Sequence, residues 1–202
     1  MGHTGRPIAA LSLASLMLGI AGSALWYQDM RYALPTPRPR GLVQAPVGSS
    51  LAARIQAAGL DVPNGQPVAL HFYNPDCPCS QFNLDHLRKL VRSYGSQVRF
   101  IAVVEGDRHG LAAFDSAGLN VPANLDSHGA IAAACGVYST PQAVLLDAEG
   151  KLYYRGNYNS ARYCVSPASE YVRIALESLV AGQPSPTFTP GATVAYGCAI
   201  PR

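Results

Sequence analysis

Charged residues are scarce in this sequence. Asp, Glu, Lys and Arg make up 13% of its 202 residues, and the formal net charge is only +3. The basic residues are scattered, and no cluster of lysine and arginine forms the positive stripe that nucleic-acid binding requires. An internal repeat is also lacking. We therefore expect one ordinary domain with attached segments and no nucleic-acid partner.

One stretch near the N-terminus has no charge at all. It runs from Ile8 to Tyr27 and ends in two aromatic residues, which are typical of a membrane interface. At 1.5 Å per residue, roughly 20 helical residues cross a hydrocarbon core of about 30 Å. The alternative is a cleaved signal peptide, with the small residues 22–24 as its cleavage site. We favour an uncleaved anchor within residues 1–30, because the run is longer than a usual signal core.

Both interpretations export the remainder of the chain, and the five cysteines fit an oxidising compartment. We therefore expect a protein of the bacterial inner membrane, held there by Ile8–Tyr27, with its soluble domain facing the periplasm. Residues 31–50 are rich in proline and predict a stiff linker that holds the domain off the membrane surface. Residues 51–202 form the domain and a cysteine-containing tail.

Hydrophobic periodicity within the domain alternates between the two regular structures. Short apolar or β-branched runs predict strands at 68–73, 98–104, 142–147 and 151–155. Apolar positions three and four residues apart predict helices at 51–60, 78–94, 108–117, 129–135 and 168–181. This order of elements predicts an α/β fold in which helices flank a mixed central sheet.

Cys77-Pro78-Cys79 lies where the first predicted strand meets a helix. Pro78 suits the first helical position, where a missing N–H has no cost, so Cys77 becomes the cap residue. We expect it to be the more exposed of the two cysteines, because Cys79 then lies inside the first turn. The unpaired N–H groups of the first helical turn then favour the thiolate, the reactive form of cysteine. Two buried small residues would be the plain alternative. Because the two cysteines flank a proline at a strand-to-helix junction, we interpret them as a redox or metal site.

Three segments around this motif resemble the thioredoxin superfamily, with the likeness running from about Val68 to Ala181. They are the site Phe72-Tyr73-Asn74-Pro75-Asp76-Cys77-Pro78-Cys79, the stretch Cys135-Gly136-Val137-Tyr138-Ser139-Thr140-Pro141 and the hairpin around Asp147. The sequence is similar to membrane-anchored exported thioredoxins and redoxins, including members of unassigned function with an Asp-Cys-Pro-Cys-Ser site. Gly197-Cys198-Ala199-Ile200 resembles the Gly-Cys-x-Ile tail of some redoxins.

The resemblance implies a thiol-disulfide oxidoreductase that needs no cofactor. Cys77 would attack the disulfide of a protein or of a small thiol compound, and Cys79 or failing that Cys135 would release the product. Thr140-Pro141 would carry the cis peptide bond beside which thioredoxin-like proteins hold an extended substrate strand.

Asp76 departs from the family pattern, because a tryptophan usually precedes the first cysteine. Its charge opposes thiolate formation at Cys77, so Asp76 is a candidate modulator, or a proton acceptor for Cys79. A single residue separates the two cysteines, so a disulfide between them would be tight. Peroxidase chemistry fits less well, because Asn74 occupies the position of the required Thr or Ser.

Two further expectations concern the other cysteines and metals. We prefer a structural disulfide between Cys164 and Cys198, because the proline-rich segment between them has little regular structure.

The alternative function is Cu(I) binding for metalloenzyme assembly, since two thiolates on one helical turn suit Cu(I). Copper chaperones of this fold, however, keep a ligand histidine near the loop that holds Thr140 here, and this sequence has none there. A docking module that has lost its chemistry is a third possibility.

Overall fold

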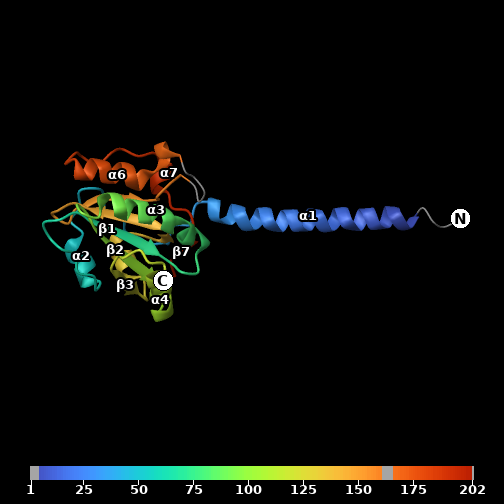
Figure 1. Cartoon of the computed structure of the whole chain (residues 1–202), viewed down its shortest axis with the longest axis horizontal. Helices are drawn as coiled ribbons and strands as arrows, with labels where there is room; N and C mark the ends of the chain where they lie inside the picture. Colours follow the sequence, from blue (N-terminus) through green and yellow to red (C-terminus); the bar gives the residue numbers. More distant parts are fainter. Residues whose placement is uncertain (1–4, 161–165, 202) are drawn as a thin grey trace.

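The computed structural model describes residues 5–160 and 166–201. A helix, α1 (Gly5–Ala33), extends away from a domain built around a central sheet (Figure 1). Within α1, residues Ile8–Met30 have a mean hydropathy of 2.0, and the domain buries none of them. The apolar run is therefore a helix long enough to cross a membrane, as predicted, and it also satisfies the pattern of a signal sequence.

The central sheet has five strands in the order β3-β2-β1-β5-β6. Strand β1 (Val68–Tyr73) lies in the centre and pairs in parallel with β2 (Arg99–Glu105), which pairs in parallel with β3 (Ala123–Asp126). On its other side β1 pairs antiparallel with β5 (Gln142–Leu146), which forms a hairpin with β6 (Leu152–Gly156). The mixed sheet predicted from the sequence is confirmed.

Side chains of β1 point alternately to the two faces of this sheet, because successive residues of a strand face opposite ways. Ala69 and Tyr73 pack in one hydrophobic cluster, whereas Leu70 and Phe72 pack in the other. All six residues of β1 are buried, which explains why its sequence, apart from His71, is an apolar run rather than an alternating pattern.

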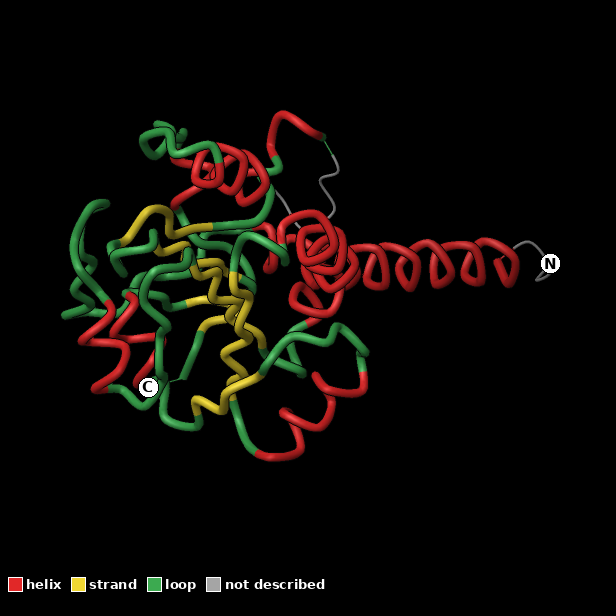
Figure 2. Tube along the Cα trace, turned by 60° about the vertical axis from the view of Figure 1, so that its left-hand side comes forward, coloured by secondary structure: helices red, strands yellow, loops and turns green. Residues whose placement is uncertain are grey.

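Helices cover both faces (Figures 1 and 2). On one face, α3 (Pro78–Tyr94), α4 (Arg108–Ser116) and α6 (Tyr171–Val180) contribute the buried residues Leu87, Phe114 and Leu176, among others. On the other, α2 (Ala52–Ala57) and α5 (Ala130–Cys135) contribute Ile55 and Ile131. Each helix predicted in the domain is observed to within a few residues. Within the described residues, the helical segments that were not predicted are a 3₁₀ turn, Pro167–Ser169, and a short helix, α7 (Pro190–Thr193).

The proline-rich linker is irregular, as predicted, but it lies against the domain. Thr36 N donates a hydrogen bond to Ala195 O at 2.7 Å, and Pro35 forms an isolated bridge with Tyr196. Further along, Leu42 is buried and Ser50 forms a bridge with Lys151. The expectation of a spacer that merely holds the domain at a distance was wrong, because tail and domain residues bind its backbone.

Candidate functional site

Cys77 caps the N-terminus of α3, as the sequence predicted. Its backbone is extended, with φ −90° and ψ 112°, and Pro78 occupies the first turn. The preceding loop is held by Asn74, whose Oδ1 accepts a hydrogen bond from Asp76 N at 2.7 Å. Asn74 O also accepts a hydrogen bond from Cys77 N at 3.2 Å. The local sequence thus presents the Cys77 sulfur at the positive end of the helix.

The structure joins Cys77 to Cys198 in a disulfide, with a Cα–Cα distance of 5.9 Å and 121 residues between them in sequence. The predicted Cys164–Cys198 disulfide is therefore wrong, because the sulfur of Cys198 is already bonded. Cys164 itself lies outside the described residues. The tail leaves α7 and returns to the N-terminal end of α3, a path that sequence spacing does not reveal.

The two cysteines of the motif are almost equally buried. Cys77 is 0% exposed and Cys79 is 2% exposed. The expectation that Cys77 is the more exposed was wrong, because the tail covers it. In this state Cys79 lies inside the first turn of α3, and the bond to Cys77 is made by Cys198 instead. Asp76 is exposed on the loop before them.

The peptide bond between Thr140 and Pro141 is cis, which confirms that prediction. The Cys77 Sγ lies 3.4 Å from Thr140 O, so the cis-proline and the disulfide belong to one site. Thr140 lies in β4 (Ser139–Thr140), which pairs antiparallel with β7 (Cys198–Ala199). The edge expected to hold a substrate strand is thus occupied by the tail of the same chain.

Two buried hydroxyl groups hold this tail. Ser139 Oγ lies 3.0 Å from Tyr196 O and 3.1 Å from Cys198 O, both of which can accept its proton. Thr36 Oγ1 lies 2.9 Å from Ser139 Oγ, so the linker completes the arrangement. Sequence reasoning did not assign Ser139 or Thr36 a role. Ser139 adjoins the predicted cis-proline, and that was the available signal for it.

Gly197 fits this site because it has no side chain. Its φ is +111°, a conformation that favours glycine. A Cβ at this position would lie 2.2 Å from Thr140 O, inside the van der Waals distance of a backbone atom. The close approach of β7 to β4 thus requires glycine immediately before Cys198.

The carboxyl group of Glu105 binds the loop that precedes Cys77. Asn74 Nδ2 donates a hydrogen bond to Glu105 Oε2 at 3.0 Å, at the end of β2. The pKa of Glu105 is raised to about 7, chiefly by burial; the hydrogen bond from Asn74 opposes this rise, and the charges of Asp126 and Asp76 add to it. The sequence pattern did not single out Glu105, which reads as the polar end of an apolar strand.

Replacing Glu105 with glutamine should flatten the pH dependence of stability. Because the pKa is raised in the folded protein, this group's stabilising contribution is complete below its ordinary pKa of 4.5 and is lost as pH rises through about 7. At pH 8, Glu105→Gln should therefore raise the free energy of unfolding by about 1–2 kcal/mol, a value reduced for solvent screening. Urea unfolding at pH 4.5 and 8 measures it. The exposed Glu149→Gln serves as the control, and an equal gain at both pH values would contradict the assignment.

Cys135 lies at the end of α5 with 1% of its surface exposed. Burial raises the pKa of its thiol to about 12, so the thiolate is strongly disfavoured at neutral pH. The described structure thus brings together Cys77, Cys198, Thr140 and Pro141, with Asp76 and Cys79 on adjacent turns. It gives Cys135 the environment of a packed core residue.

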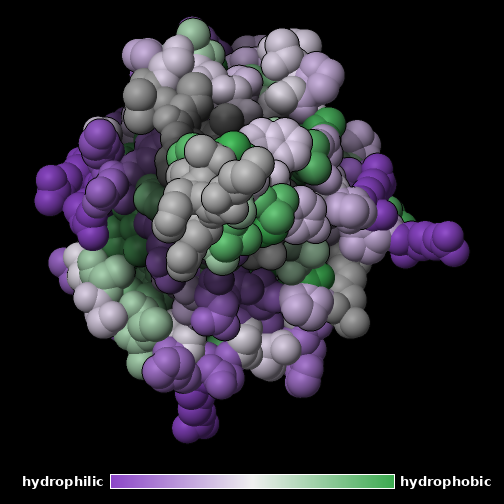
Figure 3. All heavy atoms as spheres, turned by 90° about the vertical axis from the view of Figure 1, so that its right-hand side faces the viewer, coloured by the Kyte–Doolittle hydropathy of each residue, from purple (hydrophilic) through white to green (hydrophobic). Residues whose placement is uncertain are grey.

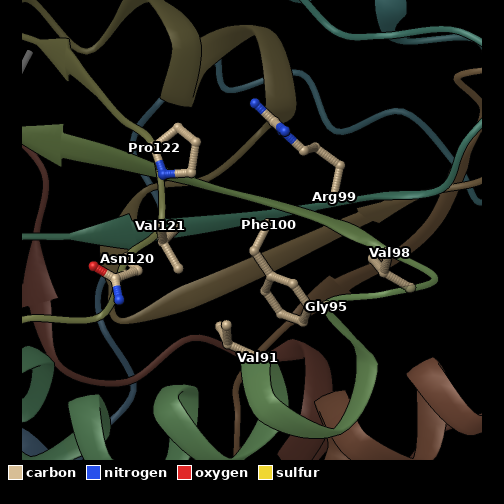
Figure 4. Close-up of a pocket in the computed structure, with 8 residues that line it drawn as sticks. All are labelled: Val91, Gly95, Val98, Arg99, Phe100, Asn120, Val121 and Pro122. Atoms are coloured by element: carbon tan, nitrogen blue, oxygen red, sulfur yellow. The ribbon is translucent and has the colours of Figure 1, made fainter.

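A small cavity of about 130 Å³ lies at the other end of α3 (Figure 4). Val91, Gly95 and Phe100 line it, together with the loop around Val121. Cys77 caps the first turn of α3, whereas Gly95 follows its last residue. The cavity is therefore separate from the disulfide and contributes nothing to its chemistry.

Comparison with known proteins assigns the chain that carries this site to a family. Residues 49–200 match the family described as "Domain of unknown function (DUF6436)". The chain belongs to the DUF6436 family. A search of curated proteins gave no match.

Solved structures show that this DUF6436 protein has a thioredoxin-like fold. A hypothetical protein from Sinorhizobium meliloti 1021 superposes with a TM-score of 0.62 at 19% identity, covering 78% of this chain and 95% of that one. An uncharacterized conserved protein from Geobacillus kaustophilus gives 0.59 at 22% identity, covering 82% and 93%. A thioredoxin-like protein solved in its oxidised form gives 0.50 at 14% identity, covering 74% and 97%. The thioredoxin-like fold that the resemblance implied is confirmed.

Residues 5–160 and 166–201 contain no group of three or more His, Cys, Asp or Glu side chains placed to hold a metal ion. Cys77, one of the two thiols that the copper hypothesis requires, is bonded to Cys198. Copper binding remains an untested prediction, and it would require this disulfide to be reduced.

Proposed function

We propose that this DUF6436 protein is a membrane-tethered thiol-disulfide oxidoreductase whose redox couple is Cys77–Cys198. The observation that carries the proposal is the position of the disulfide, at the N-terminal cap of α3 and 3.4 Å from the carbonyl beside the cis-proline. A thioredoxin-like fold keeps its reactive cysteine at this junction, and the helix end favours the thiolate there.

The exchange begins from the reduced protein. The Cys77 thiolate attacks one sulfur of a substrate disulfide, forming a mixed disulfide and releasing the other sulfur as a thiolate. The Cys198 thiolate then attacks the Cys77 sulfur, which releases the second substrate thiolate and forms Cys77–Cys198. Two electrons pass to the substrate, and the two protons lost by the cysteines are taken up by the products. The same steps in reverse oxidise a dithiol.

The oxidised protein is reduced again by attack on the more accessible sulfur. Cys198 is partly exposed whereas Cys77 is buried, so an incoming thiolate reaches Cys198 first. Its attack releases the Cys77 thiolate, the better leaving group because the helix terminus stabilises it. A second thiolate then frees Cys198. The reductant is a small dithiol or a protein dithiol.

The N-terminal helix supports a location of this chemistry beside a membrane. Linker residues Pro35 and Thr36 follow α1 almost directly and contact the tail that carries Cys198. Figure 3 looks along α1 toward the domain and shows hydrophilic residues around the rim of that face, as suits a surface beside lipid headgroups. A disulfide persists in an oxidising compartment, which supports the periplasmic side of a bacterial inner membrane.

Redox titration of the full chain in detergent tests the proposal. In glutathione buffers, Cys77 and Cys198 should become accessible to a thiol reagent together, as one two-electron couple. Cys135→Ala is the matched control and should leave the midpoint unchanged. A Cys77–Cys198 disulfide that stays oxidised in every glutathione mixture would contradict the proposal. Stoichiometric Cu(I) binding by the reduced protein, without reversible titration in those buffers, would instead favour the copper alternative.

A further inference from the structure

Strand β7 occupies the place that a substrate strand would take. It pairs with Ser139 and Thr140 in register, so Cys198 lies opposite Thr140 and its sulfur reaches Cys77. A strand of another protein bound at this edge would use the same backbone groups of β4. The tail and a substrate strand therefore cannot bind at the same time, because both would pair with the same backbone groups of Ser139 and Thr140.

We propose that the tail is a redox-released occupant of a peptide-binding edge, whose other ligand is an extended polypeptide segment that carries a Gly-Cys pair. The proposal rests on the proposed function, since the Cys77–Cys198 bond must be reducible. In the oxidised protein the edge is closed by the covalent tail. In the reduced protein the tail can leave, and a partner segment takes its place.

Much of the contact with the tail is made through its backbone. Thr36 N binds Ala195 O, the Ser139 hydroxyl faces Tyr196 O and Cys198 O, and Ile200 N donates a hydrogen bond to Tyr138 O at 3.0 Å. Such bonds do not depend on the tail's side chains, so another extended segment can form them. The groove is thus built from the linker and from residues 138–140.

Side chains of the tail define which segment fits. The residue before the cysteine must be glycine, because a Cβ there would meet Thr140 O at 2.2 Å. Tyr196 and Ile200 are 7% and 6% exposed, so a partner needs an apolar residue at each of these positions. The segment therefore has the pattern aromatic-Gly-Cys-x-aliphatic, which positions the partner's cysteine beside Cys77.

Only the end of the chain needs to move. The preceding helix α7 is held by Asn157, whose N donates a hydrogen bond to Ala192 O at 2.7 Å. Asn157 Nδ2 also donates one to Val194 O at 2.7 Å. These bonds fix the chain up to residue 194. Beyond that point the disulfide, the hydrogen bonds to Thr36, Tyr138 and Ser139, and the packing of Tyr196 and Ile200 hold the tail.

A fluorescent peptide tests the groove. Its sequence copies residues 194–201 with serine in place of the cysteine, so it binds without exchanging disulfides. It is titrated onto the full chain in detergent and followed by anisotropy. The reduced wild type should bind it at least 10-fold more tightly than the oxidised wild type. The same peptide with alanine in place of its glycine should not bind.

Variants of the chain separate groove opening from other effects of reduction. Reduced Gly197→Ala should bind the peptide more tightly than reduced wild type, because its own tail no longer competes. Gly182→Ala is the matched control: Gly182 also has positive φ, but a Cβ there meets nothing within 4 Å. It should leave peptide binding unchanged.

Failure of this proposal differs from failure of the proposed function. Equal or absent peptide binding in both redox states, with a reversible Cys77–Cys198 couple in glutathione buffers, would overturn the peptide-binding edge alone. A disulfide that glutathione never reduces would overturn both. Reduced protein that forms dimers by tail exchange, lost in Gly197→Ala, would identify a second copy as the occupant and overturn the assignment to a separate partner.

Discussion

Replacing Cys198 with serine is expected to trap Cys77 as a mixed disulfide. When oxidised glutathione is added to Cys198→Ser, the Cys77 thiolate should attack it and retain one glutathione, because the sulfur that would release it is gone. In the wild type, Cys198 attacks as an intramolecular nucleophile, and such groups act at a high effective concentration. The lifetime of the adduct should therefore rise by at least about 100-fold. Intact-protein mass spectrometry measures the adduct with time.

Variants of the other cysteines sharpen this result. Cys77→Ser should form no adduct and show no exchange, because the attacking sulfur is missing. Cys79→Ser should resolve the adduct as fast as the wild type, since Cys198 remains. An adduct that persists in Cys79→Ser and resolves in Cys198→Ser would return the resolving role to Cys79, as the sequence alone suggested.

Reduction of the disulfide is expected to lower stability strongly. The bond closes a loop across a separation of 121 residues, and constraining so long a loop in the unfolded chain raises the free energy of unfolding by about 4–5 kcal/mol. For a domain of this size that corresponds to a melting temperature lower by roughly 10 °C in the reduced protein. Thermal unfolding of the full chain in detergent, followed by circular dichroism with and without dithiothreitol, measures the change.

The variant Cys198→Ser provides the comparison for this effect. Without reductant it should melt near the temperature of the reduced wild type, because both lack the same bond. Added dithiothreitol should then shift the wild type far more than the variant. A wild type whose melting temperature does not respond to dithiothreitol would contradict the disulfide.

The sequence alone determined the local features of this protein. Hydrophobic periodicity predicted β1, α3 and their junction, because the side chains that face the core recur at the period of the element. Cys77 was placed at the helix cap for the same local reason, since Pro78 fits the first helical position. The apolar run of α1 was equally evident, and the resemblance around Thr140-Pro141 predicted the cis bond that is observed.

Short elements escaped sequence analysis. Strand β3 has four residues, Ala-Asn-Leu-Asp, which form a strand because β2 offers them a parallel edge. Strand β7 has two residues and exists through its pairing with β4. Neither carries enough apolar residues for a recognisable period, so tertiary contact decides their structure.

Only the tertiary structure decided which cysteine pairs with Cys77. The sequence favoured Cys79 as its redox partner, from the Cys-Pro-Cys motif, and Cys164 as the partner of Cys198, because the segment between those two is rich in proline. The fold instead brings Cys198 across 121 residues to the N-terminal end of α3, where its backbone pairs with Thr140 and its carbonyl accepts a hydrogen bond from Ser139 Oγ. Pairing over such a distance depends on where the sheet places β4 and where the tail crosses it, and no local pattern of residues encodes either position.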